Sequence, residues 1–102
     1  MSTVPEFDLR ESVPGTLAVT GALVFDNAAE VLAQARPLLA DGRQGCLDLA
    51  AVTRVDSAGM AAVLAMMAEA RRYGGRLQVL HPPANLLDLA RVCEVTPLLA
   101  AA

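Results

Sequence analysis

Apolar and polar residues alternate at the start of the chain and give way to longer apolar stripes further on. The segments Glu6–Val13 and Thr16–Thr20 both alternate, the first of them imperfectly. The Pro14-Gly15 pair between them is a turn signal. The pattern predicts an N-terminal β-hairpin, and we expect Gly21 to end or bend its second strand.

A helical pattern follows the hairpin over Ala28–Ala40. One apolar stripe occupies positions with helical spacing, namely Val31, Leu32, Ala35, Leu38 and Leu39. Asn27 precedes the stripe and is predicted to be the helix N-cap, since its side chain can accept a first-turn N–H. Pro37 falls inside the pattern and predicts a kink or an early end.

The second half of the chain alternates short apolar runs with helical segments. Gly45–Leu49 predicts an inner strand, and Ala50–Val55 is expected to be a loop. Met60–Tyr73 is strongly helical and stops at Gly74-Gly75, a pair suited to a left-handed helix end. Three further elements are expected: a strand at Arg76–Leu80 stopped by Pro82 and Pro83, a helix at Leu86–Val92 capped by Asn85, and a terminal strand or turn at Val95–Leu99.

This order of elements predicts an α/β fold with a mixed β-sheet and helices packed on one face. The 102 residues are expected to form a single domain over 1–102, because single cores run to about 100–150 residues. A hydrophobic content of 55% excludes disorder. The longest uninterrupted apolar run, Ala58–Ala68, is much shorter than the roughly 20 residues that a membrane span needs, so no direct membrane insertion is expected.

The net charge indicates which partners to expect, and the cysteines indicate the cellular compartment. The net charge is −3 and all eight basic residues are Arg, so nucleic acid is not expected as a partner. Cys46 and Cys93 stand in apolar runs and are interpreted as small buried hydrophobes in a reducing compartment, with a disulfide as the less favoured alternative. Residues Met1–Glu6 lack the layout of a signal peptide, which predicts a cytoplasmic protein.

The sequence lacks the usual signatures of catalysis. The single His81 and two scattered Cys cannot complete a zinc site, and no glycine-rich phosphate loop is present. Ser57, His81 and an Asp could be combined into a triad on paper, but their spacing does not support it. We therefore expect no enzyme activity, no metal and no cofactor.

The most informative segment is Asp56-Ser57-Ala58-Gly59, which opens the apolar helix. Asp56 or Ser57 is predicted to cap that helix. Gly59 in a first turn costs about 1 kcal/mol relative to Ala, which suggests that the backbone there approaches either its own sheet or a partner closely. Ser57 has two interpretations, a simple cap or a hydroxyl that is phosphorylated where the helix dipole favours negative charge.

The helix after this segment carries almost no charge over its first three turns. Met60, Leu64, Met67 and Arg71 trace one stripe, and alanines occupy much of the remainder. Either neighbouring helices bury this surface, or it is a docking surface for another protein. The candidate partner-binding residues are Arg54, Asp56, Ser57, Ala58, Gly59, Met60, Ala61 and Ala62, with Pro82 and Pro83 shaping a nearby loop.

Taken together, these segments resemble a STAS domain, the sulfate-transporter and anti-sigma-antagonist family. The likeness runs from about Thr16 to Leu99. It is carried by Leu17–Gly21, by Leu47-Asp48-Leu49, by Val55–Met60 with its Asp-Ser-x-Gly helix start, and by Gly74–Leu77. The resemblance implies the STAS fold and a module that binds other proteins.

Within that family the chain is similar to MlaB-type domains, on the strength of Leu23–Ala28 and Asn85–Val92. This likeness implies a non-catalytic cytoplasmic subunit, peripheral to the inner membrane through its partner, the ATPase of a phospholipid ABC transporter that maintains outer-membrane lipid asymmetry. It also implies that the Ser57 corner and the adjoining helix face meet the ATPase.

The alternative is an anti-sigma factor antagonist phosphorylated at Ser57 by an anti-sigma kinase. Members of that group commonly carry Gly-Glu-Leu-Asp or Gly-Glu-Ile-Asp after the second strand, whereas Gly21-Ala22-Leu23-Val24 has no carboxylate. They also usually have a longer C-terminal helix than the residues after Leu99 allow.

Overall fold

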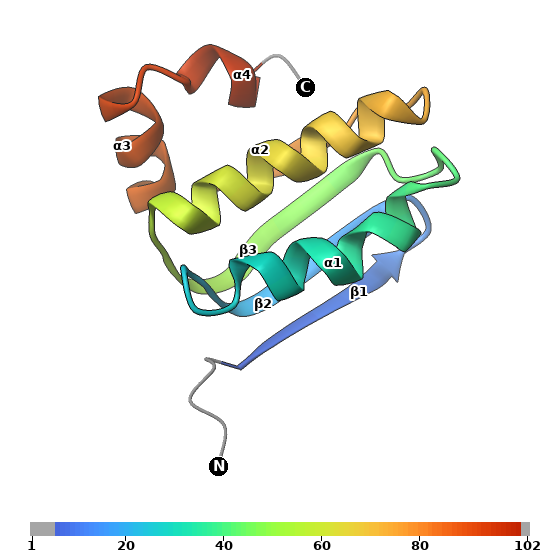
Figure 1. The fold of residues 1–102 in the computed structure, drawn as a ribbon, viewed down its shortest axis with the longest axis horizontal. Coiled ribbons are helices and arrows are strands. Elements are labelled where there is room, and N and C mark those ends of the chain that lie inside the picture. The colour runs from blue at the N-terminus through green and yellow to red at the C-terminus, as the bar shows by residue number, and fades with distance from the viewer. Residues whose placement is uncertain (1–5, 101–102) are drawn as a thin grey trace.

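A four-stranded sheet with the strand order β1-β2-β3-β4 organises the protein (Figure 1). The structure, a computed structural model, describes residues 6–100. The stretch before Glu6, where no signal peptide is expected, therefore lies almost wholly outside the described residues. Strand β1 (Phe7–Val13) runs antiparallel to β2 (Thr16–Leu23), whereas β3 (Cys46–Val55) and β4 (Gln78–Leu80) continue the sheet in parallel. The predicted hairpin and mixed sheet are confirmed.

Two long helices lie side by side across one face of this sheet (Figure 1). They are α1 (Ala28–Leu39) and α2 (Ser57–Arg72). The shorter α3 (Ala84–Val92) lies beside the first turns of α2, and α4 (Thr96–Ala100) leads back along the sheet edge toward β4. The prediction of helices packed on one face is therefore confirmed, with the C-terminal pair closing the β4 edge.

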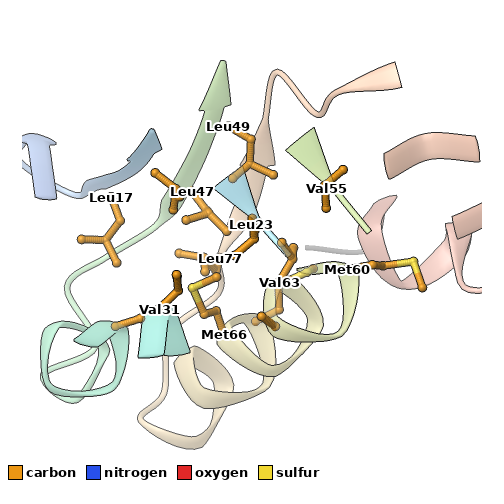
Figure 2. Close-up of a cluster of buried hydrophobic side chains, with 14 of the residues drawn as sticks. Leu17, Leu23, Val31, Leu47, Leu49, Val55, Met60, Val63, Met66 and Leu77 are labelled. Atoms are coloured by element: carbon orange, nitrogen blue, oxygen red, sulfur yellow. The ribbon is translucent and has the colours of Figure 1, made fainter. Parts of the chain in front are cut away.

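The core fills the space between the sheet and these helices (Figure 2). Leucines of the central strands β2 and β3 point toward α1 and α2 and are fully buried, because alternate residues of a strand share one face. Each such side chain contributes about 1.5–3 kcal/mol relative to an exposed one. The central members of the cluster are Leu17, Leu23, Val31, Leu47, Leu49, Val63, Met66 and Leu77.

Strand β3 is longer than its apolar run predicts. Ala50–Val55, expected to be a loop, is the second half of β3 and pairs with the end of β2. The register shifts where the Asp48 carboxylate accepts the backbone N–H of Ala50 at 2.9 Å. The prediction was wrong because pairing with β2, rather than apolar content, holds this segment extended. As a result β3 runs directly into the start of α2.

The start of α1 also differs from the prediction. Asn27 occupies the N-cap position, but its side chain makes no capping hydrogen bond to the helix. Its Oδ1 instead accepts the backbone N–H of Val24 at 3.0 Å, and its Nδ2 donates to the carbonyl of Ala22 at 2.9 Å. The buried amide therefore fixes the turn between β2 and α1. At the other end, α1 continues past Pro37 to Leu39 and does not end early.

The C-terminal third corrects three further expectations. Strand β4 is confined to Gln78–Leu80, the part that pairs with β3. Helix α3 begins at Ala84, with Pro83 at its N-cap, so Asn85 is not the cap. The expected strand or turn at Val95–Leu99 is instead the helix α4, whose early proline lacks an N–H where a helix does not need one.

The cysteines are less buried than expected. Cys46 is half-buried, Cys93 is exposed at the end of α3, and both are free thiols. The expectation of burial was wrong for Cys93 because the residue follows the last turn of α3 on the solvent side, where apolar neighbours in sequence provide no cover.

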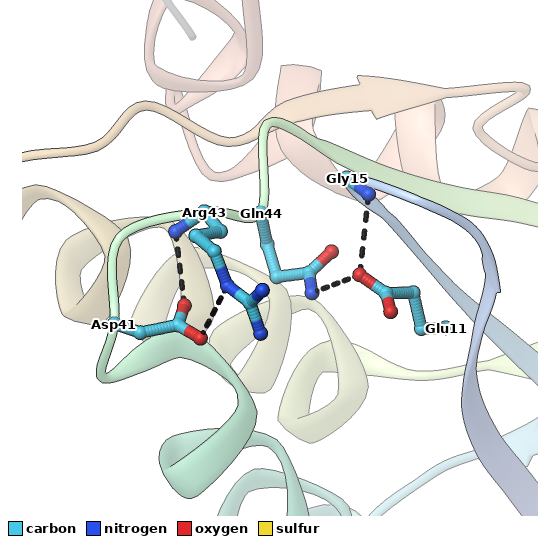
Figure 3. Close-up of polar contacts among 5 residues, drawn as sticks. All are labelled: Glu11, Gly15, Asp41, Arg43 and Gln44. Carbon is cyan, nitrogen blue, oxygen red and sulfur yellow. Dashed lines mark hydrogen bonds and ion pairs between the residues drawn. The ribbon is translucent and has the colours of Figure 1, made fainter.

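Polar contacts tie the β1–β2 hairpin to the loop before β3 (Figure 3). The Glu11 carboxylate accepts hydrogen bonds from Gln44 Nε2 at 2.6 Å and from the backbone N–H of Gly15 at 3.2 Å. The hydrogen bond from Gln44 is the largest cause that lowers the pKa of Glu11. Beside it, Asp41 accepts from both the backbone and the side chain of Arg43. These contacts lie at the end of the sheet opposite the start of α2.

Candidate partner-binding site

The junction between β3 and α2 is organised by the Asp56 carboxylate. One oxygen accepts the backbone N–H of Gly59 at 2.9 Å, and the other accepts the backbone N–H of Phe25 at 2.9 Å. Asp56 has extended backbone geometry and is the N-cap of α2. The prediction that Asp56 or Ser57 caps the helix is confirmed, and the capping residue is Asp56. The same side chain also holds the β2–α1 loop against the start of α2.

The electrostatics of Asp56 follow from these contacts. Partial burial raises the pKa of the carboxyl, but the N–H donors of Phe25, Gly59 and Ala58 together outweigh it. The net result is a pKa below the ordinary value of an aspartate. Asp56 is therefore ionised near neutral pH, as an N-cap at the positive end of a helix should be.

The structure shows which atoms the backbone of Gly59 approaches closely. A Cβ added there would collide with the backbone carbonyl of Leu23 and with the Val55 side chain. The close approach is therefore to the chain's own sheet and not to a partner. Gly59 is buried, so its place among the candidate contact residues is corrected: it brings α2 close to β2 and supports the corner from behind.

The accessible part of α2 is narrower than its uncharged sequence suggests. Met60 and Ala62 are 6% and 5% exposed and belong to the core, so they are corrected from partner contacts to packing residues. Ala58 is half-buried against that core, whereas Ser57 and Ala61 are exposed. Since Ser57 and Ala61 are four residues apart, they share one helix face. Neighbouring elements thus bury most of the helix and leave a strip of small residues open.

Two depressions meet at Asp56. The first, of about 480 Å³, extends to Phe25 and includes Arg54, Asp26 and Thr53. The second, of about 500 Å³, extends past Ser57 to Val92 on α3. Both are lined by Val55, Asp56 and Asn85, and we call these two adjoining depressions together the Asp56 trough.

The trough assembles some candidate residues and leaves others apart. Arg54, Asp56 and Ser57 are brought together. Pro83 precedes α3 and therefore adjoins Asn85, but Pro82 lines a separate depression against β4 and α4. Pro82 does not line the trough, and its role in shaping the nearby loop stays a prediction.

Three residues of the trough were not predicted from the sequence. Asn85 donates from Nδ2 to the carbonyl of Val55 at 2.6 Å and thereby fastens α3 to the end of β3. Phe25 and Val92 are 79% and 76% exposed. The only sequence signal was an aromatic residue directly before Asp-Asn in a turn, and it does not report whether the ring is covered.

The surroundings of this junction were also expected to lack a metal site and a catalytic triad. Within residues 6–100 no group of three acidic, histidine or cysteine side chains is placed to hold a metal ion. His81 Nδ1 lies 3.0 Å from Oδ1 of Asp48 on β3. In the same part of the chain, no helix combines the length and apolar character that crossing a bilayer requires.

Similar solved structures define the class of fold. The anti-sigma factor antagonist SpoIIAA in its unphosphorylated form superposes with a TM-score of 0.69 at 20% identity, covering 90% of this chain and 84% of SpoIIAA. The phosphorylated form, from Bacillus, gives 0.66 over 90% and 86%. The murine anion transporter Slc26a9 gives 0.60 at 18% identity over 79% of this chain, which matches only 14% of that transporter. The fold is that of a STAS domain.

The family follows from a sequence match. A family model described as "Mlab, STAS domain" matches residues 8–100, nearly the whole chain. The chain therefore belongs to the MlaB-type STAS domain family, as its sequence motifs predicted. A search of curated proteins finds no match.

Proposed function

We propose that this chain is a non-catalytic, cytoplasmic subunit that binds the ATPase of a phospholipid ABC transporter maintaining outer-membrane lipid asymmetry. The observation that carries the proposal is the MlaB-type family match over residues 8–100. The geometry supports a binding role, because Ser57 is exposed at the mouth of the Asp56 trough and Asp56 fixes the surrounding backbone.

The contact surface in this proposal consists of Arg54, Ser57 and Ala61 together with the trough. Met60, Gly59 and Ala62 hold it in place from inside the core, and Ala58 lies at its edge. A surface backed by close packing binds at lower entropic cost than a mobile loop.

The test is co-expression of the tagged chain with the ATPase and permease of the same transporter. Ala61→Glu places a charge on the exposed strip and should abolish copurification while leaving the thermal unfolding midpoint unchanged. Ala33→Glu is the matched control, since Ala33 is an exposed alanine in the middle of α1. That variant should copurify as the wild type does.

Two results would contradict this proposal. If the wild-type chain fails to copurify with the ATPase, the transporter role is wrong. If Ala61→Glu copurifies at the wild-type level, the ATPase binds elsewhere and the contact surface is wrong.

A second candidate function is that of an anti-sigma factor antagonist regulated by phosphorylation at Ser57. It is favoured by the exposed Ser57 at the first residue of α2, where phosphate would lie near the positive end of the helix dipole. Incubation with candidate anti-sigma kinases and ATP, followed by mass spectrometry, tests it. Stoichiometric phosphate on Ser57 that switches binding to an anti-sigma factor would support this function over the transporter role; absence of phosphate would oppose it.

A further inference from the structure

Two highly exposed apolar side chains mark the ends of the Asp56 trough. Phe25 is 79% exposed and Val92 is 76% exposed, and among the described residues no other large hydrophobic side chain exceeds 58%. Single exposed apolar residues are common on protein surfaces. These two differ because Phe25 lines one half of the trough, Val92 lines the other, and the halves share Asp56.

Both ends of the trough are fixed by hydrogen bonds to its floor. The backbone N–H of Phe25 donates to Asp56, and Asn85 at the start of α3 donates to Val55 at the end of β3. Segments that carry both apolar residues are thus tied to the β3–α2 junction (Figure 1). Because these segments are held in place before binding, Phe25 and Val92 lose little conformational entropy when a partner binds.

The trough carries more negative than positive charges. Three carboxylates line it, those of Asp26, Asp56 and Asp88, against the single guanidinium of Arg54. Asp88 also forms an ion pair with Arg91 at 3.3 Å, so the three carboxylates face two guanidinium groups and this surface keeps one net negative charge. Neither Asp26 nor Arg54 has an ion-pair partner in the described chain, whose sequence is itself acidic. The complementary occupant is therefore basic.

We propose that the Asp56 trough binds a basic amphipathic segment of the ATPase subunit, with apolar side chains of that segment covering Phe25 and Val92. This inference rests on the proposed function and adds to it the chemistry of the partner. Aromatic residues are enriched among those that carry most of the binding energy of an interface, and complementary charge raises the rate of association.

The test measures the dissociation constant of the full-length chain with the purified ATPase subunit at low and high salt. Phe25→Ala should weaken binding by at least about tenfold, and Val92→Ala, which removes a smaller apolar surface, should weaken it by a smaller but measurable factor. The matched controls are Tyr73→Ala and Val13→Ala, which remove an exposed aromatic residue after the last turn of α2 and an exposed valine at the end of β1, and they should leave binding unchanged.

Reversing the charge at two positions of the trough should change the affinity for the ATPase in opposite directions. Asp26→Lys should weaken binding, and Arg54→Glu should strengthen it, with both effects reduced at high salt. Circular dichroism and thermal unfolding of each variant establish that an altered affinity does not reflect a lost fold.

The outcomes separate this inference from the function on which it rests. A wild-type chain that does not bind the ATPase contradicts the proposed function itself. Binding that survives in both Phe25→Ala and Val92→Ala, or that strengthens in Asp26→Lys, overturns the trough proposal alone. If Phe25→Ala instead converts a dimer of this chain into monomers without changing ATPase affinity, the occupant is a second copy and the proposal is wrong.

Discussion

The Asp56 carboxylate joins the backbone of Phe25, 31 residues earlier in the chain, to the first turn of α2. One side chain therefore fixes two sides of the same surface. A helix cap usually affects only its own helix. Here the cap also positions an exposed aromatic ring, so its removal should alter both stability and recognition.

The first prediction concerns the pH dependence that Asp56 confers. Because its pKa is lowered in the folded state, protonation favours the unfolded state, and the stability it provides is lost as pH falls through that lowered pKa. Asp56→Asn loses the charge and keeps only one of the two acceptor oxygens, so either Phe25 or Gly59 loses the partner of its backbone N–H. We expect the variant to be less stable by about 1.5–3 kcal/mol near neutral pH, the usual contribution of a hydrogen bond to a charged group.

Urea unfolding of wild type and Asp56→Asn between neutral and strongly acidic pH checks this expectation. The two unfolding free energies should converge at the acidic end, below the ordinary aspartate pKa of about 3.9. Asp26→Asn serves as a control outside the cap. A constant difference at all pH values would show that the effect is not one of ionisation.

The second prediction concerns Gly59. Gly59→Ala would raise helix propensity by about 1 kcal/mol at an open position. At this position the added methyl collides with the carbonyl of Leu23, and overpacking of this kind costs about 1–3 kcal/mol. We expect a net loss of stability, measured by chemical unfolding. Gly45→Ala should be nearly neutral, because the nearest atom to its Cβ would be 4.0 Å away. Unchanged stability in Gly59→Ala would mean that α2 can move away from β2.

The third prediction separates two interpretations of Ser57. If Ser57 were the cap, Ser57→Ala would cost about 0.5–2 kcal/mol. Since Asp56 is the cap and Ser57 is exposed, we expect a change within about 0.5 kcal/mol. Asp56→Ala should show the cap loss instead, when both variants are compared by thermal unfolding. A large destabilisation in Ser57→Ala would contradict the structure. Loss of transporter function without loss of stability would assign Ser57 to contact or regulation.

The fourth prediction concerns the attachment of α3. Asn85→Ala removes the donor to the Val55 carbonyl and should cost about 0.5–1.5 kcal/mol, the usual net contribution of one hydrogen bond. Hydrogen exchange should accelerate in α3 while the amides of β2 keep their protection. Asn85→Asp, which keeps the size but sets a carboxylate oxygen against the Val55 carbonyl, should be at least as destabilising. Uniform acceleration across the sheet would show that the bond supports the whole fold.

The sequence motifs predicted the family and most of the fold. The hairpin, the long helix after Asp56 and the glycine stop at Gly74-Gly75 follow from local patterns, the mixed sheet follows from the order of elements, and the structure contains all of them. Local patterns succeed here because turn chemistry, helical spacing and apolar runs act over a few residues. The family match over residues 8–100 agrees with the motifs that suggested it.

Three of the wrong predictions trace to contacts that the local sequence pattern does not report. Ala50–Val55 is a strand because β2 pairs with it, and Asn27 and Asn85 bond to other segments instead of capping the helices that follow them. An asparagine before an apolar stripe has a good local reason to cap. Burial of Asn27 and the nearby Val55 carbonyl supply stronger alternatives that sequence spacing cannot reveal.

In the candidate site, too, some features follow from the local sequence and others only from tertiary packing. The sequence by itself determined that Asp56 and Ser57 open an apolar helix and that Gly59 needs a close neighbour. Both features depend on the conformation of the adjacent backbone, which local sequence patterns report. Only the tertiary structure decided that this neighbour is Leu23, that Met60 and Ala62 are buried, and that Phe25 is exposed. Exposure depends on which segments pack together, and packing is a property of the folded chain as a whole.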